Sequence, residues 1–167
     1  MSIAVYVYVL DTSYLVELYA VGRYSNATAS AEVRRLFAGA NSRGGRFFVP
    51  LPCLFELGSK IADVEHEARR TQLASKLLTD VMECLSRQRP WEITPAGPPE
   101  SILPELLRRF SSMAAKRPIG LVDAFIVSEA CRLKQRYERY GARVHLWTND
   151  RNLKSMEPDA ESVPYHW

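Results

Sequence analysis

The stretch Ile3-Ala-Val-Tyr-Val-Tyr-Val-Leu10, which is followed directly by Asp11, decides the fold. The run is apolar and rich in Val and Tyr, a composition typical of a strand buried on both faces of a parallel sheet. In open α/β sheets, ligands bind where such strands end. The sequence therefore predicts that Asp11 lies at the ligand-binding edge of a sheet.

Composition favours one globular domain. The chain has 167 residues, of which 47% are hydrophobic and 25% charged, which is enough to bury a core of its own. The longest apolar run is too short to span a membrane, and no basic n-region or cleavage site marks it as a signal peptide. Scattered cysteines and histidines form no zinc-binding pattern. We therefore expect a cytoplasmic protein that does not associate with membranes.

Strand-like and helix-like segments alternate along the chain. We expect strands at 3–10, 47–49, 91–94 and 143–147, and an edge strand near 162–163. We expect helices at 14–19, 30–38 (ended by Gly39), 64–86, 101–115 and 121–140, one opened by Pro50 and Pro52, and a short one after Asp150. This alternation predicts an α/β fold, a single domain over residues 1–167, whose mostly parallel, twisted sheet has helices on both faces.

Four carboxylates occupy comparable points of this arrangement. Asp11 and Asp150 each follow a strand directly. Asp123 lies in the first turn of a helix after a Pro/Gly break, and Glu56 lies in a helix just after a strand. In a parallel sheet these points share one edge, where bare carboxylates would repel one another. Because oxygen ligands suit hard cations, we predict that the four acids bind Mg²⁺ or Mn²⁺.

Each acid also has an ordinary structural interpretation. Asp11 and Asp150 could cap the helices that follow them. Asp123 could be an acid favoured by the helix dipole, and Glu56 could simply face solvent. Capping acids are common, so any one of these explanations is unremarkable. Four such coincidences at matching strand and helix ends are much rarer.

Four short motifs carry these acids in a fixed order. They are Val9-Leu10-Asp11-Thr12-Ser13, Leu54-Phe55-Glu56-Leu57, Gly120-Leu121-Val122-Asp123-Ala124 and Leu146-Trp147-Thr148-Asn149-Asp150, with Leu153 three residues later. The ordered set resembles the PIN-domain family, metal-dependent nucleases that include the toxins of bacterial VapBC-type toxin–antitoxin pairs. The chain is longer than compact toxins of this kind, with the extra length near 34–46, at 64–86 and after Pro158.

The resemblance implies an active site and partners. Asp11, Glu56, Asp123 and Asp150 would form the catalytic and metal-binding quartet. Thr148, and with less support Thr12 or Ser13, would supply a hydroxyl that orients a carboxylate or a water. The substrate would be RNA and the cofactor Mg²⁺ or Mn²⁺. The toxin branch also implies an antitoxin that lies along the helices near 14–19 and 51–61 and places a basic side chain among the acids.

Basic residues near the acids are candidates for binding RNA. Lys116, Arg117 and Arg151 flank the acids and could hold phosphates on either side of the cleaved bond. The alternative is that they are ordinary exposed loop charges. A symmetric homodimer is expected only because it is the commonest oligomer.

The predicted function is metal-dependent hydrolysis of RNA by the toxin of a VapBC-type pair. Two alternatives within the family stay open: a silent PIN-like module that binds RNA or protein, and a non-toxin RNA-processing nuclease. A phosphoryl-transfer site is disfavoured. A haloacid-dehalogenase-like site would have a second aspartate where Ser13 stands, and a receiver domain would have an acidic pair before its phosphorylated aspartate.

Overall fold

A parallel sheet forms the centre of the protein. The computed structural model describes residues 5–95, 97–116 and 118–161. In this part of the chain the strands β1 (Tyr6–Leu10), β2 (Arg46–Pro50), β3 (Glu92–Thr94) and β4 (Arg143–Trp147) pair in the order β3-β2-β1-β4. Every pairing is parallel, so all four strands end at the same edge. The predicted α/β fold with a central parallel sheet is confirmed.

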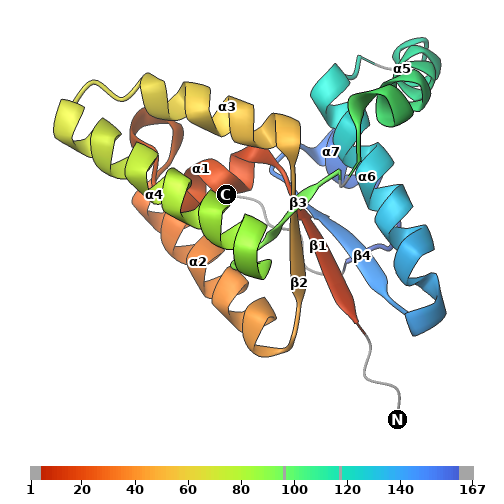
Figure 1. The fold of residues 1–167 in the computed structure, drawn as a ribbon, viewed down its shortest axis with the longest axis horizontal. Coiled ribbons are helices and arrows are strands. Elements are labelled where there is room, and N and C mark those ends of the chain that lie inside the picture. Colours follow the sequence, from red (N-terminus) through yellow and green to blue (C-terminus); the bar gives the residue numbers. More distant parts are fainter. Residues whose placement is uncertain (1–4, 96, 117, 162–167) are drawn as a thin grey trace.

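Helices cover both faces of this sheet (Figure 1). On one side lie α1 (Thr12–Tyr19), α2 (Ala27–Ser42), α3 (Leu51–Ala62) and α4 (Glu67–Arg87). On the other lie α5 (Pro99–Ala114) and α6 (Leu121–Tyr137), and the short α7 (Arg151–Lys154) follows β4. Single 3-10 turns occur at Gly22–Tyr24 and Glu138–Tyr140. No helix in the described ranges is long and apolar enough to cross a membrane.

One face of the sheet is packed with aromatic rings. Tyr8 of β1 lies between Phe47 and Trp147 of the two neighbouring strands, with ring centroids 5.4 Å and 4.5 Å away. From the helices, Tyr14 contacts Trp147 at 5.6 Å and Phe37 stacks on Phe47 at 4.1 Å. This cluster fixes α1 and α2 against the sheet, directly beneath the turn that carries Asp11.

The opposite face is aliphatic and packs against α6. Ile126, Ala130 and Leu133 of α6 are fully buried. Tyr137 of the same helix contacts Phe48 of β2, with ring centroids 6.2 Å apart. These contacts dock α6 against the sheet and place the first turn of the helix near the edge where the strands end.

Some predicted boundaries were wrong. Gly39 does not end the second helix, which continues to Ser42 because Ala40 is still buried. The turn occurs instead at Gly44, whose φ of +77° suits glycine. The helix predicted from 64 begins at Glu67. The edge strand expected near 162–163 lies outside the described residues.

Candidate functional site

The four predicted acids come from four separate elements around one edge of the sheet. Asp11 follows β1 and precedes α1, and Asp150 lies between β4 and α7. Because β1 and β4 are parallel neighbours, both residues lie at the edge where the strands end. Glu56 lies in α3, which starts directly after β2, and Asp123 lies in the first turn of α6.

Asp11 is held by hydroxyl and amide donors on both oxygens. Its Oδ1 accepts a hydrogen bond from the Thr12 amide at 2.6 Å. Its Oδ2 accepts one from Ser13 Oγ at 2.7 Å and one from Thr148 Oγ1 at 2.8 Å. The Asp11 amide donates to the Trp147 carbonyl at 3.0 Å, which extends the pairing of β1 with β4. The carboxylate therefore has a fixed orientation.

Thr148 links the two strand-end aspartates. While its hydroxyl donates to Asp11, its Oγ1 accepts a hydrogen bond from the Asp150 amide at 3.0 Å. The neighbouring Asn149 amide donates to Ser13 Oγ at 3.0 Å. The turns after β1 and β4 are thus bonded to each other, as expected for a hydroxyl that orients a carboxylate.

Glu56 belongs to the same network and does not simply face solvent. Its Oε2 accepts a hydrogen bond from Thr12 Oγ1 at 2.5 Å, and its side chain is only half-exposed. Cys53, one turn earlier on α3, is fully buried. Burial first, and then the negative charges of Asp11 and Glu56, raise the pKa of the Cys53 thiol. The thiol therefore stays protonated at neutral pH.

Asp123 responds to the charges of the other three acids. Burial raises its pKa above the ordinary aspartate value, and the negative charges of Asp11, Asp150 and Glu56 raise it further. The Gly120 amide, which donates to Asp123 Oδ2 at 3.2 Å, acts in the opposite direction. The negative charges of the other three acids thus disfavour the ionised form of Asp123, which is a condition that a bound cation would relieve.

Capping also occurs at three of the acids. Asp11 caps α1, Asp123 bonds the amide at the start of α6, and Asp150 caps α7. Both capping bonds of Asp150, from the amides of Asn152 and Leu153, use Oδ1. A cap of this kind leaves the second oxygen to face a ligand. At Asp150, capping and a ligand role are therefore compatible.

The tightest group of metal-ligating atoms in the described ranges lies elsewhere. Ligand atoms of His145, Glu157 and Glu161 lie within 4.8 Å of one another. Lys154 Nζ donates to Glu157 Oε2 at 2.7 Å and to Glu161 Oε2 at 3.2 Å. Its ammonium bonds both carboxylates and offsets one of their two negative charges, so we interpret the group as an ion-pair network and not as a metal centre.

The ligand atoms of the acidic quartet are more widely spread than those of His145, Glu157 and Glu161. This spacing limits the kind of ion that the quartet can bind. Mg²⁺ sits about 2.1 Å from its ligands and keeps several waters, so it is bound directly by one or two carboxylates. Carboxylates that bind through a water stand farther apart. The donor set consists of oxygens, and Asp123 is a half-buried acid whose pKa is raised by burial and then by the charges of the other three acids. The residues therefore fit a partly hydrated Mg²⁺ or Mn²⁺.

A hollow of about 440 Å³ opens beside the acids. It is lined by Asp11, Thr12, Ser13, Val16, Tyr24, Glu56, Ser59 and Lys60. Lys60 was missed in the sequence analysis, although its position four residues after Glu56 on a helix places both side chains on one face. The hollow is thus lined by two of the acids and by the ammonium of Lys60.

The structure describes two of the three basic residues that were predicted to contact phosphates. Lys116 lies in the turn after α5, which ends at Ala114, and Arg151 opens α7 beside Asp150; both side chains are exposed. Arg117 lies outside the described residues. Exposure leaves Lys116 and Arg151 accessible to a ligand, but the same exposure fits ordinary loop charges, so their role stays a prediction.

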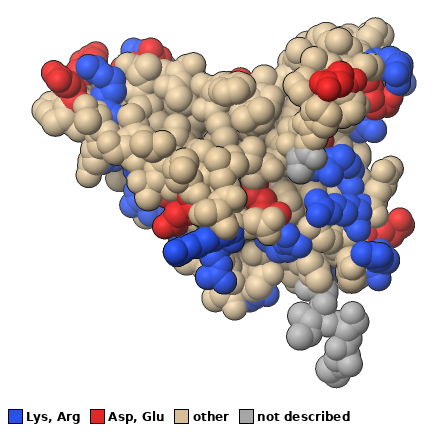
Figure 2. All heavy atoms as spheres, in the orientation of Figure 1, with Lys and Arg blue, Asp and Glu red and all other residues tan. Residues whose placement is uncertain are grey.

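The molecular surface is notched above the acidic edge. Figure 2 shows this notch between the lobe that contains α3 and the lobe that contains α5, with few charged side chains on its walls. Exposed apolar side chains on these elements include Phe55, 68% exposed, and Leu107, 49% exposed. Exposed apolar side chains of this size are a common feature of surfaces that bind a partner.

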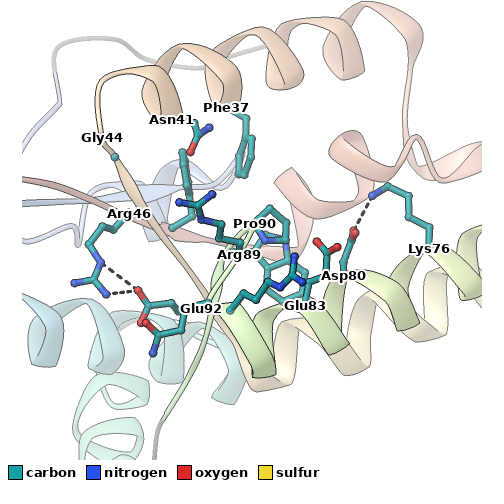
Figure 3. A pocket seen from close by; sticks show the side chains of 15 residues that line it. Phe37, Asn41, Gly44, Arg46, Lys76, Asp80, Glu83, Arg89, Pro90 and Glu92 are labelled. Carbon is teal, nitrogen blue, oxygen red and sulfur yellow. Dashed lines mark hydrogen bonds and ion pairs between the residues drawn. The ribbon is translucent and has the colours of Figure 1, made fainter.

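A larger hollow of about 880 Å³ lies away from the acids (Figure 3). It is formed by α2, α4 and the starts of β2 and β3, at the opposite edge of the sheet. Several of its charges neutralise one another: Arg46 is bonded to Glu92, and Lys76 Nζ lies 2.7 Å from Asp80 Oδ2. Size alone therefore does not identify the functional site.

Comparison with known protein families and with curated proteins found no match to this chain. The resemblance to PIN domains therefore rests on the four motifs and their order.

Proposed function

We propose that this chain is a Mg²⁺- or Mn²⁺-dependent ribonuclease of the PIN-domain type, acting in the cytoplasm as the toxin of a VapBC-type pair. One observation carries the proposal: four separate elements bring carboxylates to the edge where the strands end, and the pKa of Asp123 is raised there, first by burial and then by the charges of the other three acids. Such an arrangement is unfavourable without a cation and is suited to phosphodiester hydrolysis with one.

The chain's residues have distinct roles in this proposal. Asp11 and Asp123 would bind the cation directly, Asp150 would bind it directly or through water, and Glu56 would bind it or position a water. The bound cation would supply a water of lowered pKa and neutralise charge on the scissile phosphate. Thr148 and Ser13 hold Asp11, and Thr12 holds Glu56, so these two carboxylates need little reorientation when substrate binds.

Thr148 provides a test of this positioning. Thr148→Val removes the donor to Asp11 and the acceptor for the Asp150 amide while keeping the side-chain volume, and we expect it to lower kcat by about 10- to 100-fold. Thr148→Ser keeps the hydroxyl and should retain most of the activity. Steady-state RNA cleavage by both variants is the measurement. Equal activity of Thr148→Val and wild type would show that the hydroxyl does not position the site.

The raised pKa of Asp123 predicts how metal binding depends on pH. Without metal, the folded state holds this proton more tightly than the unfolded state. The contribution of Asp123 to stability therefore falls as pH rises from its unfolded pKa through its raised folded pKa. A cation binds the ionised form, so its affinity should increase with pH over the same window.

Thermal melting with and without Mn²⁺ at a series of pH values measures this linkage. We expect the Mn²⁺-induced rise in Tm to grow with pH in the wild type and to be smaller in Asp123→Asn. A rise that is independent of pH and unchanged in Asp123→Asn would contradict the assignment of Asp123 as a ligand.

Cleavage of RNA tests the proposed function itself. Purified protein should cut structured RNA in Mg²⁺ or Mn²⁺ but not in EDTA, and Asp11→Asn should be inactive. Glu83→Gln is a matched control, because Glu83 is an exposed acid that lines the other hollow. If the wild type binds RNA or a protein but cuts nothing with any metal, the silent binding module is the better description.

We propose that an antitoxin would lie along α3 and not along α1. The apolar side chains Tyr14, Leu15 and Tyr19 of α1 are buried, so this helix does not offer the expected docking side. On α3, Leu51 is 39% and Phe55 68% exposed, and this helix also carries Glu56. A segment lying along α3 would reach the acids with a basic side chain. The homodimer expected on general grounds stays a proposal.

A further inference from the structure

The hollow beside the acids continues along α3 to a second group of side chains. Asp11 and Glu56 line one part of the hollow, and Lys60 and Tyr24 line another. Lys60 Nζ lies 4.2 Å from the centroid of the Tyr24 ring. A cation over an aromatic ring is held in place while its N–H donors stay available. Lys60 is therefore a positioned ammonium in a cavity that it shares with two carboxylates.

The charges around Lys60 leave it able to bind an anion. The Tyr24 hydroxyl donates to Asp63 Oδ2 at 2.5 Å, and Arg23 forms an ion pair with the same oxygen at 3.4 Å. Among the described residues, Lys60 forms no ion pair of its own. The pKa of Asp63 is lowered, first by the hydrogen bond from Tyr24, then by Arg23 and last by the charge of Lys60. Arg23 also stands over the Tyr24 ring, 5.1 Å from its centroid. The Tyr24 ring thus has the cations of Lys60 and Arg23 beside it, and its hydroxyl is bonded to Asp63.

We propose that Lys60, held by Tyr24, binds a phosphate of the RNA strand next to the one that is cut. This inference rests on the proposed function. A polynucleotide is the anion that suits the cavity, because it repeats its phosphates: one can meet the cation at the acids while the next meets the ammonium. Lys60 would fix the register of the strand without contacting the reacting atoms, so it is a positioning residue.

Kinetics on a short single-stranded RNA of mixed sequence in Mg²⁺ tests this role. We expect Lys60→Met to raise KM about ten-fold, as for loss of a hydrogen bond to a charged group, with little change in kcat. The slope of log(kcat/KM) against log[salt] should become shallower by about 0.7, which corresponds to one lost contact with a single strand. Lys60→Arg should restore both values.

Lys76→Met is the matched control. Lys76 also stands over a tyrosine ring, 4.7 Å from the centroid of Tyr19, but it is paired with Asp80 and lines the other hollow. The Lys76→Met substitution should leave KM and the salt slope unchanged. If Lys60→Met behaves like Lys76→Met in an enzyme that cleaves, the inference is overturned and the proposed function stands.

A wild type that does not cleave would overturn the proposed function, and fluorescence anisotropy with the same RNA then decides the role of Lys60. Weaker, less salt-dependent binding by Lys60→Met than by Lys76→Met supports the phosphate contact. Equal binding by the two variants overturns it.

Discussion

Asp123→Asn will reduce RNA cleavage by more than about 100-fold and leave Tm unchanged or raised. Loss of a residue that only supports a metal ligand costs about 10- to 100-fold, and loss of a ligand should cost more. Stability should not fall, because the substitution removes one of four carboxylates that repel one another. Asparagine also keeps an oxygen that can accept the hydrogen bond from the Gly120 amide.

Lost cleavage together with an unchanged or raised Tm distinguishes a metal ligand from an acid that only stabilises the fold. Cleavage rates and thermal melting without metal should be measured on the same preparations of wild type, Asp123→Asn and the control Glu83→Gln. A mutant that cuts at the wild-type rate would remove Asp123 from the site. A mutant that loses both activity and several degrees of Tm would show that its main role is to cap α6.

Trp147→Ala will have the largest effect on stability, a loss of about 3–5 kcal/mol. The side chain is only 2% exposed and contacts the rings of Tyr8, Tyr14 and Phe47. Truncation leaves a cavity between β4 and α1 that these rings cannot fill without moving. For a chain of this length, the loss corresponds to a fall in Tm of about 10 °C.

Urea denaturation measures this loss, with Phe55→Ala as the control. Phe55 is also aromatic but is 68% exposed, so its truncation should change the free energy of unfolding by no more than about 0.5 kcal/mol. Similar losses in both variants would contradict the assignment of Trp147 to the core. The backbone carbonyl of residue 147, which accepts the Asp11 amide, is kept in Trp147→Ala, so cleavage should fall only if loss of the side chain shifts the end of β4.

The elements that carry the acids could be predicted because their signals are local. The apolar run before Asp11 and the segment 143–147 before Asp150 both form strands of the sheet, and β4 has the predicted bounds. Pro52 lies in the first turn of α3, where its missing amide hydrogen costs nothing. Parallel pairing of β1 with β4 then brings Asp11 and Asp150 to one edge.

The contacts inside the site could not be predicted in the same way. Thr148 and Asp11 are 137 residues apart, and Thr12 and Glu56 are 44 apart, so their hydrogen bonds depend on tertiary packing. The contact of Lys60 with Tyr24 depends on how a loop after α1 meets α3, for which no local pattern exists. Gly39 misled the prediction because burial of the next residue, Ala40, outweighed the weak helix propensity of glycine.

Direct measurement of Mn²⁺ binding tests the central claim, that the four acids form a divalent-metal site. Titration followed by electron paramagnetic resonance and by calorimetry needs no substrate, so it does not depend on which RNA is cut. We expect the wild type and Glu83→Gln to bind Mn²⁺ with the same affinity, and Asp11→Asn and Asp123→Asn to bind it at least about ten-fold more weakly. Equal affinity in all four proteins, or no binding to the wild type, would contradict the account.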